Sequence, residues 1–116
     1  MRTVLVVDDH PSFRASARAV LESAGFAVVG EASTGTEALA EIDRLGPDLV
    51  LLDVQLPDMT GFDVCRALVG VAGGPTVILV SSRDESDYGS DVADSGAAGF
   101  IAKAELAPET VEALLT

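Results

Sequence analysis

The sequence contains a single cysteine, Cys65, and few basic residues. One cysteine cannot form an internal disulfide, so a disulfide-stabilised scaffold is excluded and the composition suits a reducing cytoplasm. Seven lysines and arginines stand against nineteen aspartates and glutamates, which gives a formal net charge of −12. Because such a chain repels nucleic-acid phosphates and anionic lipids, we expect this segment itself to bind neither DNA nor a membrane.

Long apolar runs are also missing. No run reaches the roughly 18 residues that a membrane-spanning helix needs, and the first apolar stretch is cut off by Asp8 and Asp9, too early for a signal peptide. We therefore expect a soluble, cytoplasmic protein. The length of 116 residues, 48% of them apolar, is that of one domain with a sizeable core.

The chain does contain five short apolar runs with helical patterns between them. Continuous rather than alternating runs indicate strands that are covered on both faces, as in a parallel sheet between helices. The runs are Val4–Val7, Ala27–Val29, Leu49–Leu52, Thr76–Val80 and Phe100–Ala102. We therefore predict an α/β fold built from five β-α units.

Four of the connecting segments predict well-formed helices. Their start signals are Pro11, Thr34, Thr60 and Pro108. The fourth connection, Asp84–Ser95, is mostly serine and aspartate and offers only Tyr88, Val92 and Ala93 as apolar anchors. We predict that any helix there is short, weakly held and mobile.

Polar residues directly follow each apolar run, and in an open parallel sheet ligands bind beyond the carboxyl ends of the strands. These residues are Asp8, Asp9 and His10, then Glu31, then Asp53, then Ser81 and Ser82, and finally Lys103. Two carboxylates about 5 Å apart repel by roughly 3 kcal/mol at an effective dielectric of 20, so we expect a cation there. Hard oxygen ligands suit Mg²⁺. A carboxylate beside a divalent cation, an ammonium and a hydroxyl is arranged to receive a phosphoryl group, and Asp53 is the natural nucleophile.

Four motifs in order resemble the receiver domain of two-component response regulators. They are VLVVDDHPSF, DLVLLDVQLPDMTGFDVC, VILVSSRD and GAAGFIAK. The resemblance implies a flavodoxin-like (βα)5 fold over residues 1–116, a doubly wound parallel sheet with strand order 2-1-3-4-5. It also implies that the domain takes a phosphoryl group from a sensor histidine kinase and is a signalling domain, not an enzyme.

The same resemblance assigns the acceptor and the metal ligands. Asp53 corresponds to the phosphoacceptor, and Asp8 and Asp9 correspond to the acidic pair that holds Mg²⁺. In such domains Asp9 is the direct ligand and Asp8 acts largely through water. The backbone carbonyl of Gln55 completes the protein ligands, together with Asp53.

Further residues match positions that read out the phosphoryl group. Ser81 matches the hydroxyl that bonds a phosphoryl oxygen, and Lys103 matches the lysine that pairs with it. Phe100 falls on an aromatic switch position. Gln55 lies two residues after the acceptor Asp53, and Arg83 lies two residues after Ser81. In such domains these two positions tune how long the phosphoryl group survives.

The segment EASTGTEAL, and Lys103 followed by Ala104, look most like the NarL/FixJ subfamily. Its members usually have a LuxR-type helix-turn-helix after the receiver. The last helical pattern, Pro108–Thr116, ends abruptly on an apolar pair, so we expect a longer protein whose missing C-terminal domain binds DNA and regulates transcription. Phosphorylation would then act on surfaces around the first helix, the last helix or the Asp84–Ser95 segment, for instance by forming a homodimer. The first two are favoured because the helical pattern in Asp84–Ser95 is weak.

Other functions fit less well. A stand-alone receiver that binds a partner protein is the first alternative. A haloacid-dehalogenase-like phosphatase needs a second aspartate where Gln55 stands, and a flavodoxin needs a loop rich in Ser, Thr and Gly where Asp8 and Asp9 stand. We interpret His10 as a residue at the start of a helix rather than a metal ligand, and Cys65 as a core side chain.

Overall fold

Five parallel strands form one sheet in the order β2-β1-β3-β4-β5 in the computed structural model of the chain, which describes residues 1–68 and 70–115. The strands are β1 (Thr3–Val7), β2 (Ala27–Ala32), β3 (Leu49–Asp53), β4 (Thr76–Ser81) and β5 (Gly99–Ala102). The helices are α1 (Pro11–Ser23), α2 (Gly35–Leu45), α3 (Gly61–Leu68), α4 (Asp91–Asp94) and α5 (Pro108–Leu115), with 3-10 helices η1 (Glu85–Tyr88) and η2 (Lys103–Glu105). The predicted fold and strand order are confirmed; Thr116, the last residue of the predicted final helix, lies outside the described residues.

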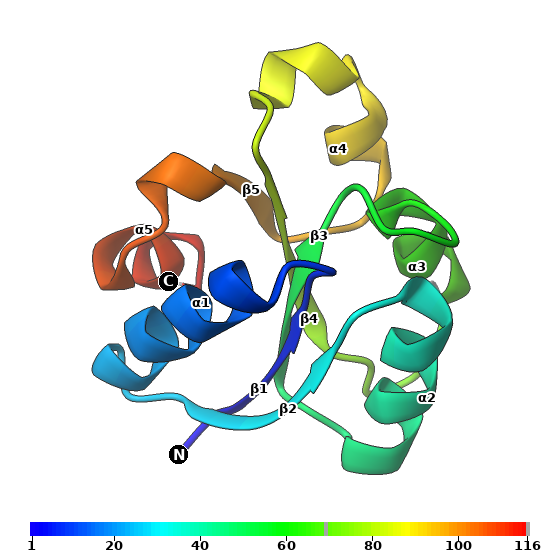
Figure 1. Ribbon diagram of the computed structural model, residues 1–116. Helices are drawn as coiled ribbons and strands as arrows, with labels where there is room; N and C mark the ends of the chain where they lie inside the picture. Colours follow the sequence, from blue (N-terminus) through cyan, green and yellow to red (C-terminus); the bar gives the residue numbers. More distant parts are fainter. Residues whose placement is uncertain (69, 116) are drawn as a thin grey trace.

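Helices cover both faces of the sheet, α1 and α5 on one side and α2 and α3 on the other (Figure 1). Leu21 and Val111 pack with one set of strand side chains, and Ile42, Phe62 and Cys65 pack with the other. The predicted core role of Cys65 is therefore confirmed. The three central strands are almost fully buried, which makes the sheet a rigid support for the side chains at its ends. Within the described ranges, no helix is long and apolar enough to cross a membrane.

Local hydrogen bonds explain where α2 and α3 begin. The Thr34 side chain accepts from the backbone N–H of Glu37, as predicted, while the Glu37 carboxylate accepts from Ser33, one residue earlier than a capping box requires. Thr60 and Asp63 make the fully reciprocal pair, each side chain accepting from the other residue's backbone N–H. These bonds satisfy N–H groups that a helix start leaves without partners.

Strand β2 is longer than its apolar run indicated. The prediction ended it at Val29, but Gly30, Glu31 and Ala32 continue the pairing with β1. The strand lies at the edge of the sheet, where polar residues are tolerated because one side is open. The prediction that Glu31 follows the strand and joins the site is therefore wrong.

The Glu31 carboxylate belongs to an ion cluster between α1 and β2. It accepts hydrogen bonds from Arg14 Nε at 2.9 Å and from Arg18 Nη2 at 2.9 Å. The bond with Arg18 is the main reason that the pKa of Glu31 is lowered, against the opposing effect of burial. This cluster ties α1 to the edge strand.

The fourth connection contains only short helical pieces, as predicted. Both η1 and α4 have only four residues. Val92 is buried and Tyr88 is half-buried, whereas Ala93, the third predicted anchor, is exposed. Ser95 is also buried, so Tyr88, Val92 and Ser95 hold this segment against the rest of the domain.

Candidate functional site

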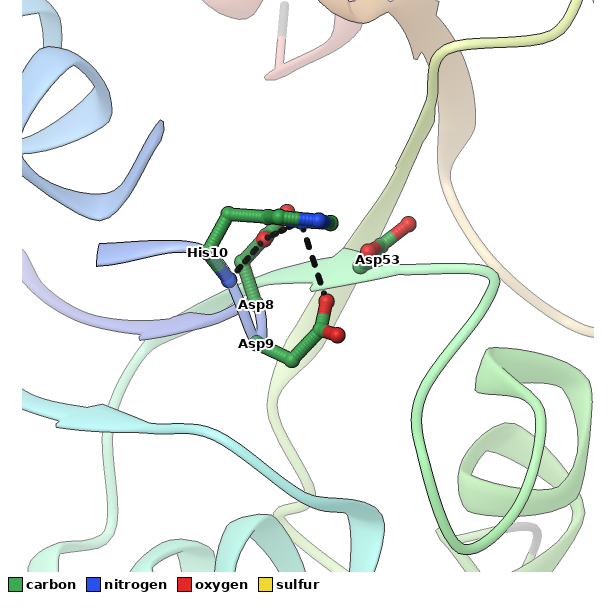
Figure 2. A group of neighbouring side chains, drawn as sticks. All are labelled: Asp8, Asp9, His10 and Asp53. Atoms are coloured by element: carbon green, nitrogen blue, oxygen red, sulfur yellow. Dashed lines mark hydrogen bonds and ion pairs between the residues drawn. The ribbon is translucent and has the colours of Figure 1, made fainter. Parts of the chain in front are cut away.

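The carboxyl ends of three strands bring the predicted acidic residues together with a lysine. Asp8 directly follows β1, Asp53 is the last residue of β3, and Lys103 directly follows β5. Asp8 is fully buried and Asp53 is 3% exposed, while Asp9 is closer to solvent. Figure 2 shows Asp8, Asp9 and His10 on the loop after β1, next to Asp53. The parallel sheet thus places residues 45 positions apart side by side.

An open cavity of about 280 Å³ lies over these strand ends. Its lining residues are Asp9, His10, Asp53, Gln55, Leu56, Pro57, Ser82 and Lys103. Most of these residues are polar or charged, and an anion of phosphate size fits a space of this volume. The backbone N–H of Gln55 donates to Asp53 Oδ1 at 3.2 Å, which orients the carboxylate within the cavity.

Lys103 contacts both buried carboxylates. Its Nζ lies 2.6 Å from Asp8 Oδ2 and 3.4 Å from Asp53 Oδ2. The ammonium also stands 4.5 Å from the centre of the Phe13 ring on α1, within cation-π range. Burial acts to lower the pKa of Lys103, but the contacts with Asp8 and Asp53 outweigh burial and raise it. The lysine is therefore a fixed positive charge in the site.

Asp53 is held in an unfavourable environment for a charged group. Burial, followed by the negative charge of Asp8, raises the pKa of Asp53 to about 6, although Lys103 and the Gln55 N–H act in the opposite direction. At neutral pH the carboxylate is still mostly ionised. It combines nucleophilic charge with poor solvation, as reactive carboxylates in functional sites often do.

The acidic residues meet the requirements of a hard divalent cation. One ligand atom from each of Asp8, Asp9, His10 and Asp53 lies within 4.8 Å of all the others. Among the described residues, no hydrogen-bond donor is aligned with the buried oxygens Asp8 Oδ2 and Asp9 Oδ1. Asp8 Oδ2 is paired with the Lys103 ammonium, and Asp9 Oδ1 lies beside the His10 ring. Clustered carboxylate oxygens beside an open cavity fit Mg²⁺, which prefers a few oxygen ligands and retains several waters.

His10 stands at the start of α1, as predicted, since it is the residue before Pro11. Its ring also joins the acidic group, because Nδ1 lies 3.1 Å from both Asp8 Oδ1 and Asp9 Oδ1. The backbone N–H of His10 donates to the same Asp8 oxygen at 2.8 Å. The sequence pattern did not indicate these ring contacts.

The residues predicted to read out the phosphoryl group occupy different positions around the cavity. Ser82 lines the cavity, whereas Ser81 is 1% exposed and its Oγ lies 2.6 Å from the Tyr88 hydroxyl. Phe100 is half-buried on β5. Arg83 is exposed, outside the cavity lining, and its backbone N–H donates to Ser81 Oγ. The roles assigned to these residues stay predictions.

Two residues of the site region were not singled out by the sequence. Asp58, in the loop after β3, accepts hydrogen bonds from the backbone N–H groups of Gly35 and Thr36 and from the Thr36 hydroxyl, and so anchors the start of α2. Tyr88, counted only as an apolar anchor, bonds Ser81. A lone tyrosine in a serine- and aspartate-rich segment is the one sequence signal that could have drawn attention to it.

The doubly wound sheet, the acidic strand ends and the lysine after β5 define a class of domain. The family model for the response regulator receiver domain matches residues 4–115, so the chain belongs to this family of signalling domains. The resemblance drawn from the four sequence motifs is thereby confirmed.

Individual relatives extend this assignment. The chain is 43% identical over 102 residues to the DNA-binding response regulator MtrA of Mycolicibacterium smegmatis, covering 86% of this chain and 43% of MtrA. The receiver domain of the response regulator NarL from Mycobacterium tuberculosis superposes with a TM-score of 0.85 at 34% identity, covering 98% of this chain and 96% of that one. A LuxR-family response regulator from an Aurantimonas species superposes with a TM-score of 0.87 at 29% identity, over 99% of this chain and 85% of that one. The chain spans about half the length of the curated relatives it matches.

Proposed function

We propose that this domain accepts a phosphoryl group on Asp53 from the phosphohistidine of a sensor histidine kinase. The observation that carries the proposal is the Asp53 carboxylate itself, 3% exposed at the end of β3, in contact with Lys103 and facing a cavity. Few structural roles require a buried carboxylate beside a second one, because the two repel. A reaction that uses this charge accounts for the arrangement.

In the proposed transfer, a carboxylate oxygen of Asp53 attacks phosphorus as the bond from phosphorus to the donor imidazole nitrogen breaks. The electron pair of that bond stays on the imidazole, which takes up a proton. Lys103 Nζ, 3.4 Å from Asp53 Oδ2, offsets the negative charge that collects on the phosphoryl oxygens. The Gln55 N–H keeps the other Asp53 oxygen in place. Charge compensation and positioning are most of what such a transfer needs.

Asp8, Asp9 and Asp53, with the backbone carbonyl of Gln55, are the groups that would hold Mg²⁺. When bound, Mg²⁺ supplies positive charge that binds phosphoryl oxygens and lowers the repulsion among the carboxylates. Asp8 also holds the Lys103 ammonium at 2.6 Å, which keeps the lysine beside the acceptor.

Phosphorylation with a small donor tests the assignment. Incubation with acetyl phosphate and Mg²⁺, followed by intact-mass measurement, should add one phosphoryl group to the wild type and none after chelation of Mg²⁺. Asp53→Asn should remain unmodified, because an amide cannot form the acyl phosphate. Asp43→Asn is a matched control, since Asp43 is exposed on α2, away from the cavity, and it should be modified as the wild type is. Equal modification of Asp53→Asn and the wild type would refute the assignment.

We further propose that the full-length protein carries a DNA-binding output region after this domain and regulates transcription. The support is that MtrA is named a DNA-binding response regulator and that structural relatives belong to the LuxR family. The charge of −12 makes this segment itself a poor DNA ligand. Reading the gene downstream of the codon for Thr116 tests the proposal. A helix-turn-helix sequence is expected; a stop codon would refute this part and favour a receiver that binds a partner protein.

A further inference from the structure

The 2.6 Å contact between the Ser81 and Tyr88 hydroxyls connects the candidate site to the segment between β4 and β5. Ser81 is the last residue of β4 and Tyr88 is the last residue of η1. Ser81 follows Val80, which pairs in register with Asp53, so the serine lies beside the acceptor strand. The chain has no other tyrosine.

The Tyr88 ring packs between two phenylalanines from other elements. Its centroid lies 5.5 Å from that of Phe62 on α3, edge to face, and 6.0 Å from that of Phe100 on β5. Both distances are typical of favourable aromatic pairs. Phe100 has no hydroxyl and cannot bond Ser81, so Tyr88 supplies the polar contact that this aromatic group makes with β4.

Residues 84–95 depend on Tyr88 for their position. Apart from the half-buried Tyr88, only Val92 and Ser95 of this segment are shielded from solvent, and its two helical pieces have four residues each. A segment with so few buried contacts opens at low free-energy cost. Losing the Tyr88 contacts would therefore loosen it, since Val92 and Ser95 are its remaining buried residues.

The Ser81 hydroxyl makes its contacts outside the cavity over Asp53. Ser81 Oγ accepts from the Arg83 N–H at 3.1 Å and lies 2.6 Å from the Tyr88 hydroxyl, and either hydroxyl can be the donor in that bond. Ser82 rather than Ser81 lines the cavity. To reach a phosphoryl oxygen on Asp53, Ser81 Oγ therefore has to turn toward the cavity and away from Tyr88.

We propose that Tyr88 is a positioning residue that competes with the phosphoryl group for the Ser81 hydroxyl, so that phosphorylation of Asp53 releases Tyr88 and residues 84–95. The inference rests on the function proposed above for Asp53. It gives the poorly anchored fourth connection a role, because Tyr88 is one of only three residues of this segment that are shielded from solvent, together with Val92 and Ser95.

Binding of beryllofluoride, a phosphoryl mimic, measures the competition. With Mg²⁺ present, calorimetry should show that Tyr88→Phe binds beryllofluoride about three- to tenfold more tightly than the wild type, the range expected for removing one competing hydrogen bond. In a Ser81→Ala background the same Tyr88→Phe change should have no effect, because the competition is gone. Ser86→Ala, an exposed serine in η1, is the matched control and should behave as the wild type does.

Because Tyr88 is the only tyrosine in the sequence, its spectroscopic signal reports on this one side chain. Near-ultraviolet circular dichroism in the tyrosine band reports how firmly an aromatic ring is fixed. Beryllofluoride should weaken this signal in the wild type and in Ser86→Ala. Ser81→Ala should show the weakened signal before any ligand is added.

The outcomes separate this inference from the function on which it rests. Beryllofluoride binding with an unchanged tyrosine signal would overturn the inference alone. So would unchanged or weaker binding by Tyr88→Phe, or the same tightening in the Ser81→Ala background. If the wild type binds no beryllofluoride, the proposed acceptor role of Asp53 fails, and the inference fails with it.

Discussion

Replacing Asp53 with asparagine should stabilise the domain in the absence of divalent cations. The wild-type carboxylate is buried beside Asp8, and its pKa is raised from 3.8 to about 6. At 1.36 kcal/mol for each pKa unit, this rise corresponds to a penalty of about 3 kcal/mol for the ionised group. The amide removes the charge but keeps an oxygen that can accept from the Gln55 N–H. Lys103 is not left unpaired, because Asp8 remains 2.6 Å away.

The pH dependence of this difference follows from the direction of the pKa change. A carboxyl group whose pKa is higher in the folded state binds more protons there, so folding stability falls as pH rises from about 4 to about 6. Asparagine does not titrate. The stability advantage of Asp53→Asn should therefore be near zero around pH 4, increase through about pH 6 and level off above about pH 7.

Urea unfolding at several pH values, with a chelator present, measures this difference if the transition is two-state. Above about pH 7 the variant should be more stable by about 2 to 3 kcal/mol, equivalent to roughly 6 to 12 °C in melting temperature. Asp43→Asn removes the same charge from an exposed helix position and should stay within about 0.5 kcal/mol of the wild type. The reasoning is refuted if Asp53→Asn is no more stable than the wild type at about pH 7.5, or if its advantage does not shrink toward about pH 4.

Two further substitutions test how the loop after β3 is built. Asp58→Asn should lower the melting temperature, because hydrogen bonds from the Thr36 hydroxyl, the Thr36 N–H and the Gly35 N–H hold the pKa of Asp58 down to about 2. The deficit, measured by thermal unfolding, should be complete above about pH 5 and shrink as pH falls toward about 2. A pH-independent deficit would contradict this reading. Gly61→Ala should destabilise the domain by about 2 kcal/mol in urea unfolding, since the new Cβ would lie 2.6 Å from the Asp53 carbonyl oxygen. Gly→Ala in a helix usually increases stability. An increase here would show that the backbone moves to relieve the close contact.

The strands and the centre of the site could be predicted from sequence for the same physical reason. Strands covered on both faces need continuous apolar runs, and the carboxyl ends of parallel strands meet at one edge. Asp8, Asp53 and Lys103 could therefore be placed together from their positions alone, and their contacts at 2.6 and 3.4 Å confirm that placement. The parallel arrangement of the strands was sufficient to predict that these three side chains lie together.

The features that sequence did not reveal depend on side-chain contacts between elements. Glu31 was placed in the site because the apolar run ends at Val29, but an edge strand can continue with polar residues. Asp58 bonds α2 across 22 residues, and no helical or strand periodicity encodes that contact. Tyr88 looked like a minor apolar anchor because its role depends on where a hydroxyl lies, not on its hydrophobicity.

A short physical route connects the proposed reaction to a change at the surface. The central strands are almost fully buried, and because protein interiors are closely packed they cannot move much when charge changes at Asp53. The responsive groups are the side chains just beyond the strand ends, where β3 and β4 lie side by side. Asp53 pairs with Val80, Ser81 is the next residue, and its hydroxyl touches Tyr88 in the weakly held segment. Coupling needs an element with two arrangements that both sites bias. In the mechanism proposed above the Ser81 hydroxyl is such an element, because it contacts Tyr88 in this structure and has to turn away from Tyr88 to reach a phosphoryl oxygen on Asp53.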